Sequence, residues 1–248
     1  MKIKWLIVII ITVIVGCNSK ENIESKLIYQ KWFCPDQFLF IEFYDHQKGK
    51  FINYRINEIH DFNYSTTNDS LIIDYKELNY KRGQLLNLDK ITTDSLTITY
   101  VEPLTKQSSY WMNFGDSLIF YPAKNFYDSN LVLDSVLIHG GQFIERIDVQ
   151  ISVNKDGKIL FREKNIFNKT NIDTVLYNQN KLFNDLQEIV RYADIETLDS
   201  TYSDLNHDVF IYTIEIFYNK NKYLKFNENQ LPLSIKTLID YPFFTLKD

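Results

Sequence analysis

The stretch Arg146-Ile-Asp-Val-Gln-Ile-Ser-Val-Asn-Lys-Asp-Gly-Lys-Ile-Leu-Phe-Arg162 carries the clearest fold signal in the chain. In its first half, isoleucine and valine alternate with polar or charged residues, the pattern of a strand with one buried face. Asn154-Lys155-Asp156-Gly157 then predicts a tight hairpin turn, because these residue types tolerate the backbone angles that such turns need. Lys158–Arg162 is the return strand. The stretch therefore predicts an antiparallel β-hairpin.

Two helices are predicted downstream of this hairpin. Between Asn178 and Ala193 the apolar residues recur at offsets of three and four, which is typical of a helix with one buried side. Asn178 is the expected cap of its first turn. A second helix is predicted to open at Pro232, since proline is tolerated in a first turn, and to stop before Pro242.

The remaining elements of the C-terminal half are strands. Leu131–Ile138 precedes the first hairpin, and a second hairpin joins Val209–Phe217 to Tyr223–Phe226 around Asn219–Lys222. The predicted order is β-β-β-α-β-β-α. This order indicates an α+β domain over residues 127–248, with two helices on an antiparallel sheet.

The N-terminal half reads as short strands joined by polar turns. The predicted strands are Phe38–Phe43, Phe51–Ile56, Ile59–Tyr64, Leu71–Tyr75, Leu85–Ile91, Leu96–Val101 and Ser109–Phe114. Asp45–Gly49 is the expected first hairpin connection, with Gly49 at a positive φ. No helical pattern separates the strands. Residues 27–121 are therefore predicted to form an all-β antiparallel barrel or half-barrel, and the domain boundary is placed at Tyr121–Phe126.

One short motif recurs along the chain. An Asp-Ser pair followed by leucine or valine begins at Asp69, Asp94, Asp116 and, more loosely, Asp134. Asp and Ser side chains bond the backbone in turns, so the motif is interpreted as turn chemistry before a strand. A catalytic interpretation needs a base beside each serine, and the neighbouring residues supply none.

Both halves resemble domains of bacterial lipoproteins. Leu27–Phe114, with Trp32 near its start, resembles the lipocalin-like domains, although Gln30 stands where they usually have glycine. That resemblance implies a small barrel that is either filled by side chains or holds one small apolar ligand. The second half resembles a small α+β domain of unknown function from Bacteroidota lipoproteins, through Ile151–Gly157, the helix at Leu182–Tyr192, and Pro232 leading into Ile239-Asp240. The family's cysteine-containing turn reads His139-Gly-Gly-Gln-Phe143 here, so no role of that cysteine carries over.

The N-terminus has the features of an export signal. Lys2 and Lys4 precede an apolar run that ends at Val15, which is too short for the roughly 20 residues of a bilayer-spanning helix. Ile14-Val15-Gly16-Cys17 resembles the lipobox, in which the cysteine receives a diacylglyceryl group and becomes the mature N-terminus. Residues 1–17 are thus expected to be a lipoprotein signal peptide and lipobox; an uncleaved anchor or plain secretory signal is the alternative.

A polar segment follows the lipobox. Residues 18–26 have too little apolar surface to order themselves and are expected to form a flexible tether. Lys20-Glu21 loosely resembles a surface-export signal of Bacteroidota lipoproteins, with an ordinary spacer as the alternative. We therefore expect anchoring in a bacterial membrane, with the outer membrane favoured and the folded part facing the periplasm or the cell surface.

Charge and cysteine content exclude several classes. The chain has 27 Lys+Arg against 32 Asp+Glu, and the basic residues are scattered, so no nucleic-acid partner is expected. There are two cysteines. If Cys17 carries lipid, no disulfide framework remains, and Cys34, without a nearby basic cluster, is expected to be buried and inert.

No catalytic, cofactor or metal site is predicted. His46, His60, His139 and His207 stand without another His or Cys at metal-ligand spacing. His139 is expected in a flexible turn before Gly140-Gly141, exposed to solvent rather than catalytic.

One segment partly matches a calcium-binding loop. Asp204–Asp208 opens like such a loop, and Glu215 falls at its twelfth position. However, Val209 occupies the sixth position, which requires glycine for the sharp turn. We therefore interpret the segment as an acidic entry to a strand.

These observations favour a lipid-anchored, non-enzymatic protein of the cell envelope. It is expected to bind a small apolar ligand or an envelope protein partner, in addition to the membrane through Cys17. The alternatives are an enzyme or enzyme inhibitor with a site at the domain junction, and a purely structural envelope component. The sequence leaves open the ligand, the membrane leaflet and the oligomeric state.

Overall fold

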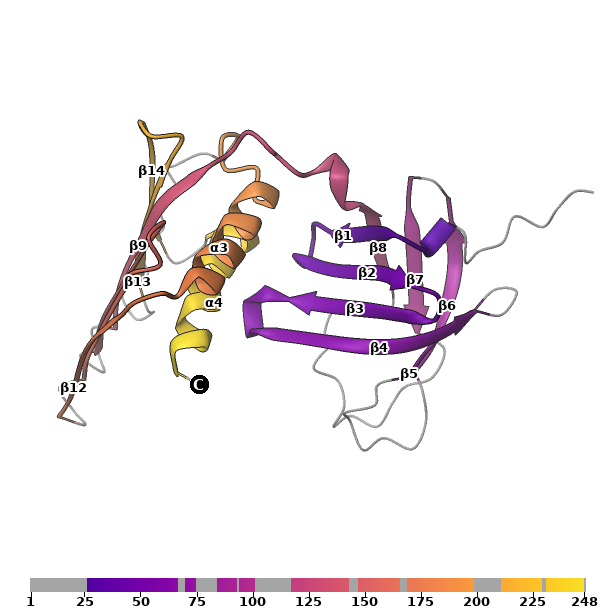
Figure 1. Ribbon diagram of the computed structural model, residues 1–248, viewed down its shortest axis with the longest axis horizontal. Coiled ribbons are helices and arrows are strands. Elements are labelled where there is room, and N and C mark those ends of the chain that lie inside the picture. Colours follow the sequence, from indigo (N-terminus) through magenta and orange to yellow (C-terminus); the bar gives the residue numbers. More distant parts are fainter. Residues whose placement is uncertain are drawn as a thin grey trace, which may run out of the picture. The chain divides into compact units, whose positions relative to one another are not determined.

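The computed structural model describes residues 26–66, 70–74, 84–92, 94–100, 117–142, 147–165, 169–198, 211–228 and 231–247. Within these ranges the chain consists mostly of antiparallel β-sheet, with two α-helices, α3 and α4 (Figure 1). One sheet is curled, and the other is open and carries the helices. The prediction of a largely antiparallel β-protein is confirmed at this level.

The curled sheet contains the first eight strands. They are β1 (Gln30–Cys34), β2 (Leu39–Asp45), β3 (Lys48–Asn53), β4 (Glu58–Thr66), β5 (Ser70–Asp74), β6 (Gln84–Ile91), β7 (Leu96–Tyr100) and β8 (Ser117–Pro122). The strands neighbour one another in chain order, and β1 also pairs with β8, at Trp32↔Pro122 and Phe33↔Tyr121. A sheet that returns to its first strand has the order of a barrel, which agrees with the predicted fold class of this half.

One strand prediction differs from the structure, and another falls outside the described residues. β3 ends at Asn53, and the expected continuation Tyr54–Ile56 forms the 3₁₀ turn η1. The Asn53 side chain causes this ending, because its Oδ1 accepts a hydrogen bond from the Arg55 amide at 3.2 Å. The predicted strand Ser109–Phe114 lies outside the described residues, and the strand that closes the sheet is β8.

The role expected for Gly49 is wrong. The positive φ in the β2–β3 turn belongs to Gln47, at 63°, and Gly49 already lies in β3. A Cβ atom at Gly49 would come within 2.4 Å of the Phe62 ring and 2.9 Å of the Glu42 carbonyl oxygen. Position 49 therefore requires glycine because the Phe62 ring lies against the backbone.

Three of the four copies of the Asp-Ser motif precede a strand. The first three copies lead into β5, β7 and β8, as expected. Before β7, however, the turn is held by Thr92, whose Oγ1 accepts from the Ser95 amide at 2.9 Å and the Asp94 amide at 3.1 Å. The fourth copy is not a turn, because Asp134 lies inside a strand at a register shift. Its Oδ2 accepts from the Lys220 amide at 2.7 Å.

The open sheet contains six strands in the order β12-β11-β10-β9-β13-β14. Their bounds are β9 (Leu133–Gln142), β10 (Ile147–Asn154), β11 (Ile159–Asn165), β12 (Thr170–Leu176), β13 (Ile211–Tyr218) and β14 (Lys222–Glu228). Gly157 takes φ +68° in the β10–β11 turn, and Asn219 and Lys220 take positive φ in the β13–β14 turn. Both predicted hairpins are confirmed. β12 was not predicted, because its apolar residues do not alternate and two of them are exposed.

The helices α3 (Asn180–Tyr192) and α4 (Leu233–Lys247) lie on one face of this sheet (Figure 1). Alternate residues of the central strands, such as Ile138, Ile151 and Ile214, are buried on that face with at most 1% exposure. The expected cap is wrong: Asn178 has a left-handed backbone at φ 60°, and Gln179 is the N-cap without a side-chain hydrogen bond.

α4 continues through Pro242 to Lys247, so its expected end before Pro242 is also wrong. A proline within a helix removes one backbone hydrogen bond and strains the preceding turn. Here Pro242 is buried, and Phe243 and Leu246 beyond it pack against the hydrophobic core. The apolar contacts of the last turn therefore outweigh the local preference of proline.

Packing divides the chain into two compact units. The first comprises Met1–Gln30, Glu42–Gly49 and Asp61–Phe120, and the second comprises Lys31–Ile41, Lys50–His60 and Tyr121–Asp248. The second unit thus includes residues of β1 to β4 as well as the open sheet and helices. The domain limits 27–121 and 127–248 stay a prediction.

Candidate functional site

The aromatic core of the second unit surrounds the end of α3. Phe33 and Phe40 stack with ring centroids 4.6 Å apart, and Tyr192 of α3 lies 5.4 Å and 4.8 Å from them. The Lys31 ammonium lies 4.6 Å from the Phe40 centroid and 5.0 Å from that of Tyr192. It also donates to Glu188 Oε1 at 2.5 Å. A lysine that contacts two ring faces and a carboxylate is held in one position by attraction from three sides.

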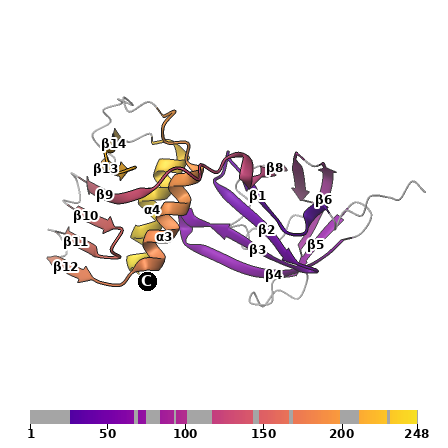
Figure 2. The same ribbon diagram turned by 45° about the horizontal axis from the view of Figure 1, so that its top comes forward.

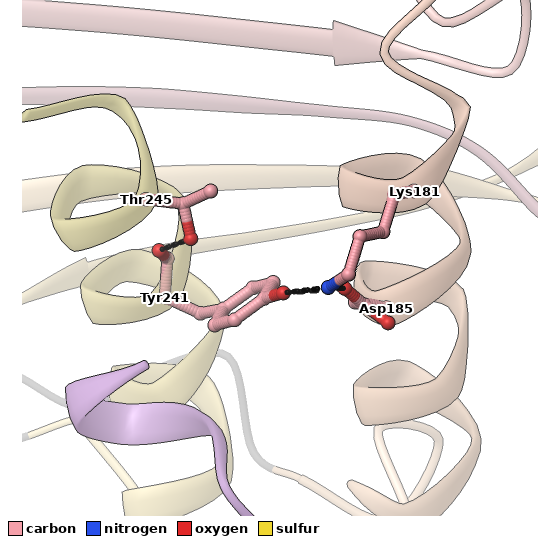
Figure 3. Close-up of polar contacts among 4 residues, drawn as sticks. All are labelled: Lys181, Asp185, Tyr241 and Thr245. Carbon is pink, nitrogen blue, oxygen red and sulfur yellow. Dashed lines mark hydrogen bonds and ion pairs between the residues drawn. The ribbon is translucent and has the colours of Figure 1, made fainter. Parts of the chain in front are cut away.

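A polar cluster joins α3 to α4 (Figure 3). Tyr241 of α4 donates its hydroxyl hydrogen to Asp185 Oδ2, and Lys181, one turn before Asp185, donates to the same oxygen at 2.7 Å. The Lys181 ammonium also lies 3.4 Å from the Tyr241 hydroxyl. Thr245 donates to the Tyr241 carbonyl at 2.7 Å. The cluster satisfies the polar groups of a tyrosine whose side chain is fully buried.

Burial keeps the tyrosines of this region neutral. The pKa of Tyr241 is raised well above 10, first by burial and then by its hydrogen bond to Asp185. Burial, with the nearby carboxylates of Glu188 and Asp185, likewise raises the pKa of Tyr54. The two rings meet edge to face, with centroids 5.3 Å apart. A tyrosine that is neutral and inaccessible to solvent cannot act as a base or nucleophile at neutral pH, so the cluster is suited to holding the helices together.

A second carboxylate of α4 is partly desolvated. Asp240 Oδ2 lies 3.5 Å from Arg55 Nε of η1. Burial raises the pKa of Asp240, while the Lys236 and Arg55 charges act against this rise. Tyr212 of β13 is also affected, since burial and the Asp240 charge raise its pKa to about 12. The negative charge of Asp240 is therefore compensated by two cations, Arg55 and Lys236.

The sequence did not single out these residues. Lys181 and Asp185 have the i,i+4 spacing of an ion pair on a predicted helix, which was a usable signal. The partner Tyr241 lies 56 residues beyond Asp185 in the chain. No local pattern connects the two positions.

The histidines lie on separate elements. His139 lies in β9, not in a flexible turn, because Gly140 and Gly141 continue the strand and pair with β10 and β13. Its Nε2 is 2.9 Å from Asp148 Oδ1, and both side chains are more than 60% exposed. His60 Nε2 lies 3.7 Å from Glu58 Oε2. His46 follows Asp45 in the β2–β3 turn, and His207 lies outside the described residues.

Other predicted positions have mixed outcomes. Cys34 is buried with 1% exposure, as expected. Cys17 and the acidic segment Asp204–Asp208 lie outside the described ranges. Glu215 lies in β13 and binds Lys225 Nζ at 2.9 Å. The structure therefore does not test lipid attachment or the calcium-loop alternative.

Metal-ligand clusters and membrane-spanning helices are both absent from the described ranges. No cluster of three or more His, Cys, Asp or Glu side chains there has the geometry to hold a metal ion. Among the same residues, no helix combines the length and apolar character needed to cross a bilayer.

Aromatic side chains also fill the core of the first unit. Phe43, Phe62 and Tyr64 form a cluster with ring centroids 5.0 to 6.5 Å apart, and each is at most 3% exposed.

Trp32, in the second unit, is fully buried, and its Nε1 has no hydrogen-bond partner within the described part of the chain. A buried donor without an acceptor costs about 1–3 kcal/mol, so Trp32 is a candidate contact for a ligand or water.

The fold and this arrangement define a β-rich protein with a curled eight-stranded sheet, an open sheet and two helices joined by a partly buried polar cluster. Comparison with protein-family models and with curated proteins found no match.

Proposed function

We propose that this protein is an exported lipoprotein, held to a bacterial membrane by acyl groups on Cys17, with a folded part that binds rather than catalyses. The observation that carries the proposal is the sequence Ile14-Val15-Gly16-Cys17 behind a short apolar run with Lys2 and Lys4 at its start. Each acyl CH₂ placed in a bilayer contributes about 0.8 kcal/mol, so two or more chains hold a protein stably.

The folded part supports a binding role over a chemical one. The carboxylates of the α3–α4 region are engaged by Lys181, Lys31 and Arg55, and the buried tyrosines beside them are kept neutral. We propose an envelope protein as the partner. The buried aromatic rings of both cores contact one another, which supports a surface contact over carriage of a ligand inside the protein.

The anchoring proposal is tested by replacing the cysteine. Cys17→Ala should abolish incorporation of labelled palmitate and release the protein from the membrane fraction, because no acylated residue remains. Cys34→Ala is the matched control, since this buried cysteine should not affect either measurement. Mass spectrometry of the purified wild-type chain should show acylated Cys17 as its first residue. A mature chain that begins elsewhere, or carries no acyl mass, contradicts the proposal.

Trp32 favours a second candidate function, the binding of a small apolar ligand with one hydrogen-bond acceptor. Its buried Nε1 lacks a partner within the described ranges, and an acceptor on a ligand would satisfy it. Native mass spectrometry of the full chain in detergent should then show a bound small molecule that Trp32→Phe loses. Tyr29→Phe, at a residue that is 75% exposed, is the control and should keep it. If the measured mass of the wild-type chain shows no bound small molecule, this candidate is contradicted.

A further inference from the structure

The two edges of the open sheet differ in how they are protected. β12 and β14 are its outermost strands, at opposite edges in Figure 2. β14 has Lys222 and Lys225, the type of charged residue that commonly prevents an edge from pairing with another chain. β12 has the sequence Thr170-Asn-Ile-Asp-Thr-Val-Leu176, without lysine or proline. Within the described residues, no strand pairs with its outer side.

The exposed side chains of β12 are partly apolar. Ile172 is 40% and Val175 is 41% exposed, and they belong to opposite faces of the strand. The only charge in β12 is that of Asp173, and the Arg162 Nε of β11 binds its carboxylate at 3.1 Å. The edge therefore has apolar groups available on both faces and no uncompensated charge that would repel another strand.

The charge pattern of β12 matches a second copy of itself. In an antiparallel pair with a two-fold axis at Ile172, each Asp173 lies opposite the Asn171 of the other copy. Lys164 pairs with Asn171 inside one sheet, just as Arg162 pairs with Asp173. The row across the junction is then Arg162, Asp173, Asn171 and Lys164, so an uncharged amide lies opposite the carboxylate and like charges do not meet. A two-fold axis at Asp173 would instead place the two carboxylates opposite each other, which is unfavourable.

We infer that two copies of this chain form a dimer by antiparallel pairing of β12 with β12 about Ile172, which joins their open sheets into one. This inference goes beyond membrane anchoring and does not depend on it. Backbone hydrogen bonds satisfy the open edge, and the exposed Ile172 and Val175 side chains lose contact with water. Closed two-fold symmetry limits this pairing to two copies, since each chain contributes the same β12 edge to it.

Cysteine cross-linking tests the dimer and its register in the full chain. Ile172 faces itself across the axis at a Cα separation of about 4.5–5.5 Å, within the range of a disulfide. Ile172→Cys, oxidised in whole cells that express the full chain, should therefore give a band of twice the chain mass on a non-reducing gel. Tyr223→Cys, at a comparably exposed position on β14, should give only the band of the single chain on this gel, and so should the wild-type chain. Neither of them can form the disulfide at position 172. A Tyr223→Cys band as strong as that of Ile172→Cys overturns the inference, as does the absence of any Ile172→Cys band.

A second measurement avoids the introduced cysteine. Sedimentation of the purified full chain in detergent should show a dimer, and Ile172→Lys should raise its dissociation constant at least tenfold, because two ammonium groups would meet at the axis. Tyr223→Lys should leave the constant unchanged, and circular dichroism should show that both variants are folded. A monomeric wild-type chain, or a dimer that Ile172→Lys does not weaken, overturns the inference.

Discussion

At the residue scale, the best-defined feature is the set of buried tyrosine hydroxyls. Tyr241 is fully buried, yet its hydroxyl finds an acceptor in Asp185, whose charge Lys181 compensates. A hydrogen bond to a charged group contributes more than one between neutral groups. The hydroxyl therefore links the helices where an apolar side chain of similar size would only fill space.

The first prediction concerns this hydroxyl. Tyr241→Phe should lower the free energy of unfolding by about 2 kcal/mol, because the partly buried Asp185 carboxylate loses a hydrogen bond. Urea denaturation of the variant and the wild type measures the difference. Tyr29→Phe, at an exposed position, should change it by less than about 0.5 kcal/mol. Equal effects of the two variants would show that the Asp185 contact contributes nothing.

The second prediction concerns alkaline pH. Tyr54, Tyr212 and Tyr241 have raised pKa values in the folded protein, about 12 for Tyr212, against an ordinary value of 10.0. A raised pKa means that the folded state holds the proton more tightly than the unfolded state does. The stabilisation is thus complete below pH 10 and is lost as the pH rises from 10 through the folded value.

Chemical denaturation between pH 8 and 11.5 should accordingly show an unfolding free energy that falls above pH 10. Tyr212→Phe should make this fall shallower, because one contributing hydroxyl is gone. Tyr223→Phe, at an exposed tyrosine of β14, is the control. An identical fall in the wild type and the Tyr212 variant contradicts the assignment.

At the element scale, side-chain contacts determine turns and helix ends as much as local preference does. Gly49 lies in β3 because Phe62 occupies the space of a side chain, and α4 crosses Pro242 because the following residues reach the core. In each case a contact between distant residues outweighs the usual meaning of glycine or proline. The same applies to the end of β3, which the Asn53 side chain determines.

The third prediction tests the contact at Gly49. Gly49→Ala should destabilise the protein by about 1–3 kcal/mol, the usual cost of overpacking, since the new methyl group meets the Phe62 ring and the Glu42 carbonyl. Thermal or urea unfolding measures the loss. Lys50→Ala, at the next residue, is the control and should have a much smaller effect. A harmless Gly49→Ala would show that Phe62 moves aside without cost.

At the scale of the whole molecule, the second compact unit combines segments that are distant from one another in the sequence. Lys31–Ile41 and Lys50–His60 belong to the same compact unit as the open sheet and the helices. Phe33, Phe40 and Tyr54 are part of the large hydrophobic core formed around α3 and α4. The cooperative unit of folding should therefore include residues from both halves.

The fourth prediction follows from this composition. Tyr192→Ala in α3 should cost about 3–5 kcal/mol, the usual loss for a large core aromatic, because Phe33 and Phe40 lose a ring contact. Native-state hydrogen exchange should then show faster exchange in β1 and β2 as well as in α3. Tyr223→Ala, at an exposed aromatic, should leave these amides protected. Exchange that rises in α3 alone would contradict a shared unit.

The sequence predicted the class of each element better than its limits. Alternation and the Asn154–Gly157 turn identified β10 and β11, and the 3.6-residue period identified α3. The sequence did not predict β12, because an edge strand keeps both faces partly in water and its apolar residues need not alternate. The sequence did not predict the cluster of Lys181, Asp185 and Tyr241, because its members come from two helices that only the folded chain brings together.

The sequence alone therefore determined the local periodicities, the hairpin turns and the export signal proposed for residues 1–17, since each depends on neighbours within a few positions. The tertiary structure decided that a hydroxyl of α4 is buried, that the Phe62 ring occupies the space of a side chain at Gly49, and which strands form the edges of the open sheet. These features depend on groups that are distant along the chain and meet only when apolar surface is buried. Their physical basis is packing, which no short stretch of sequence contains.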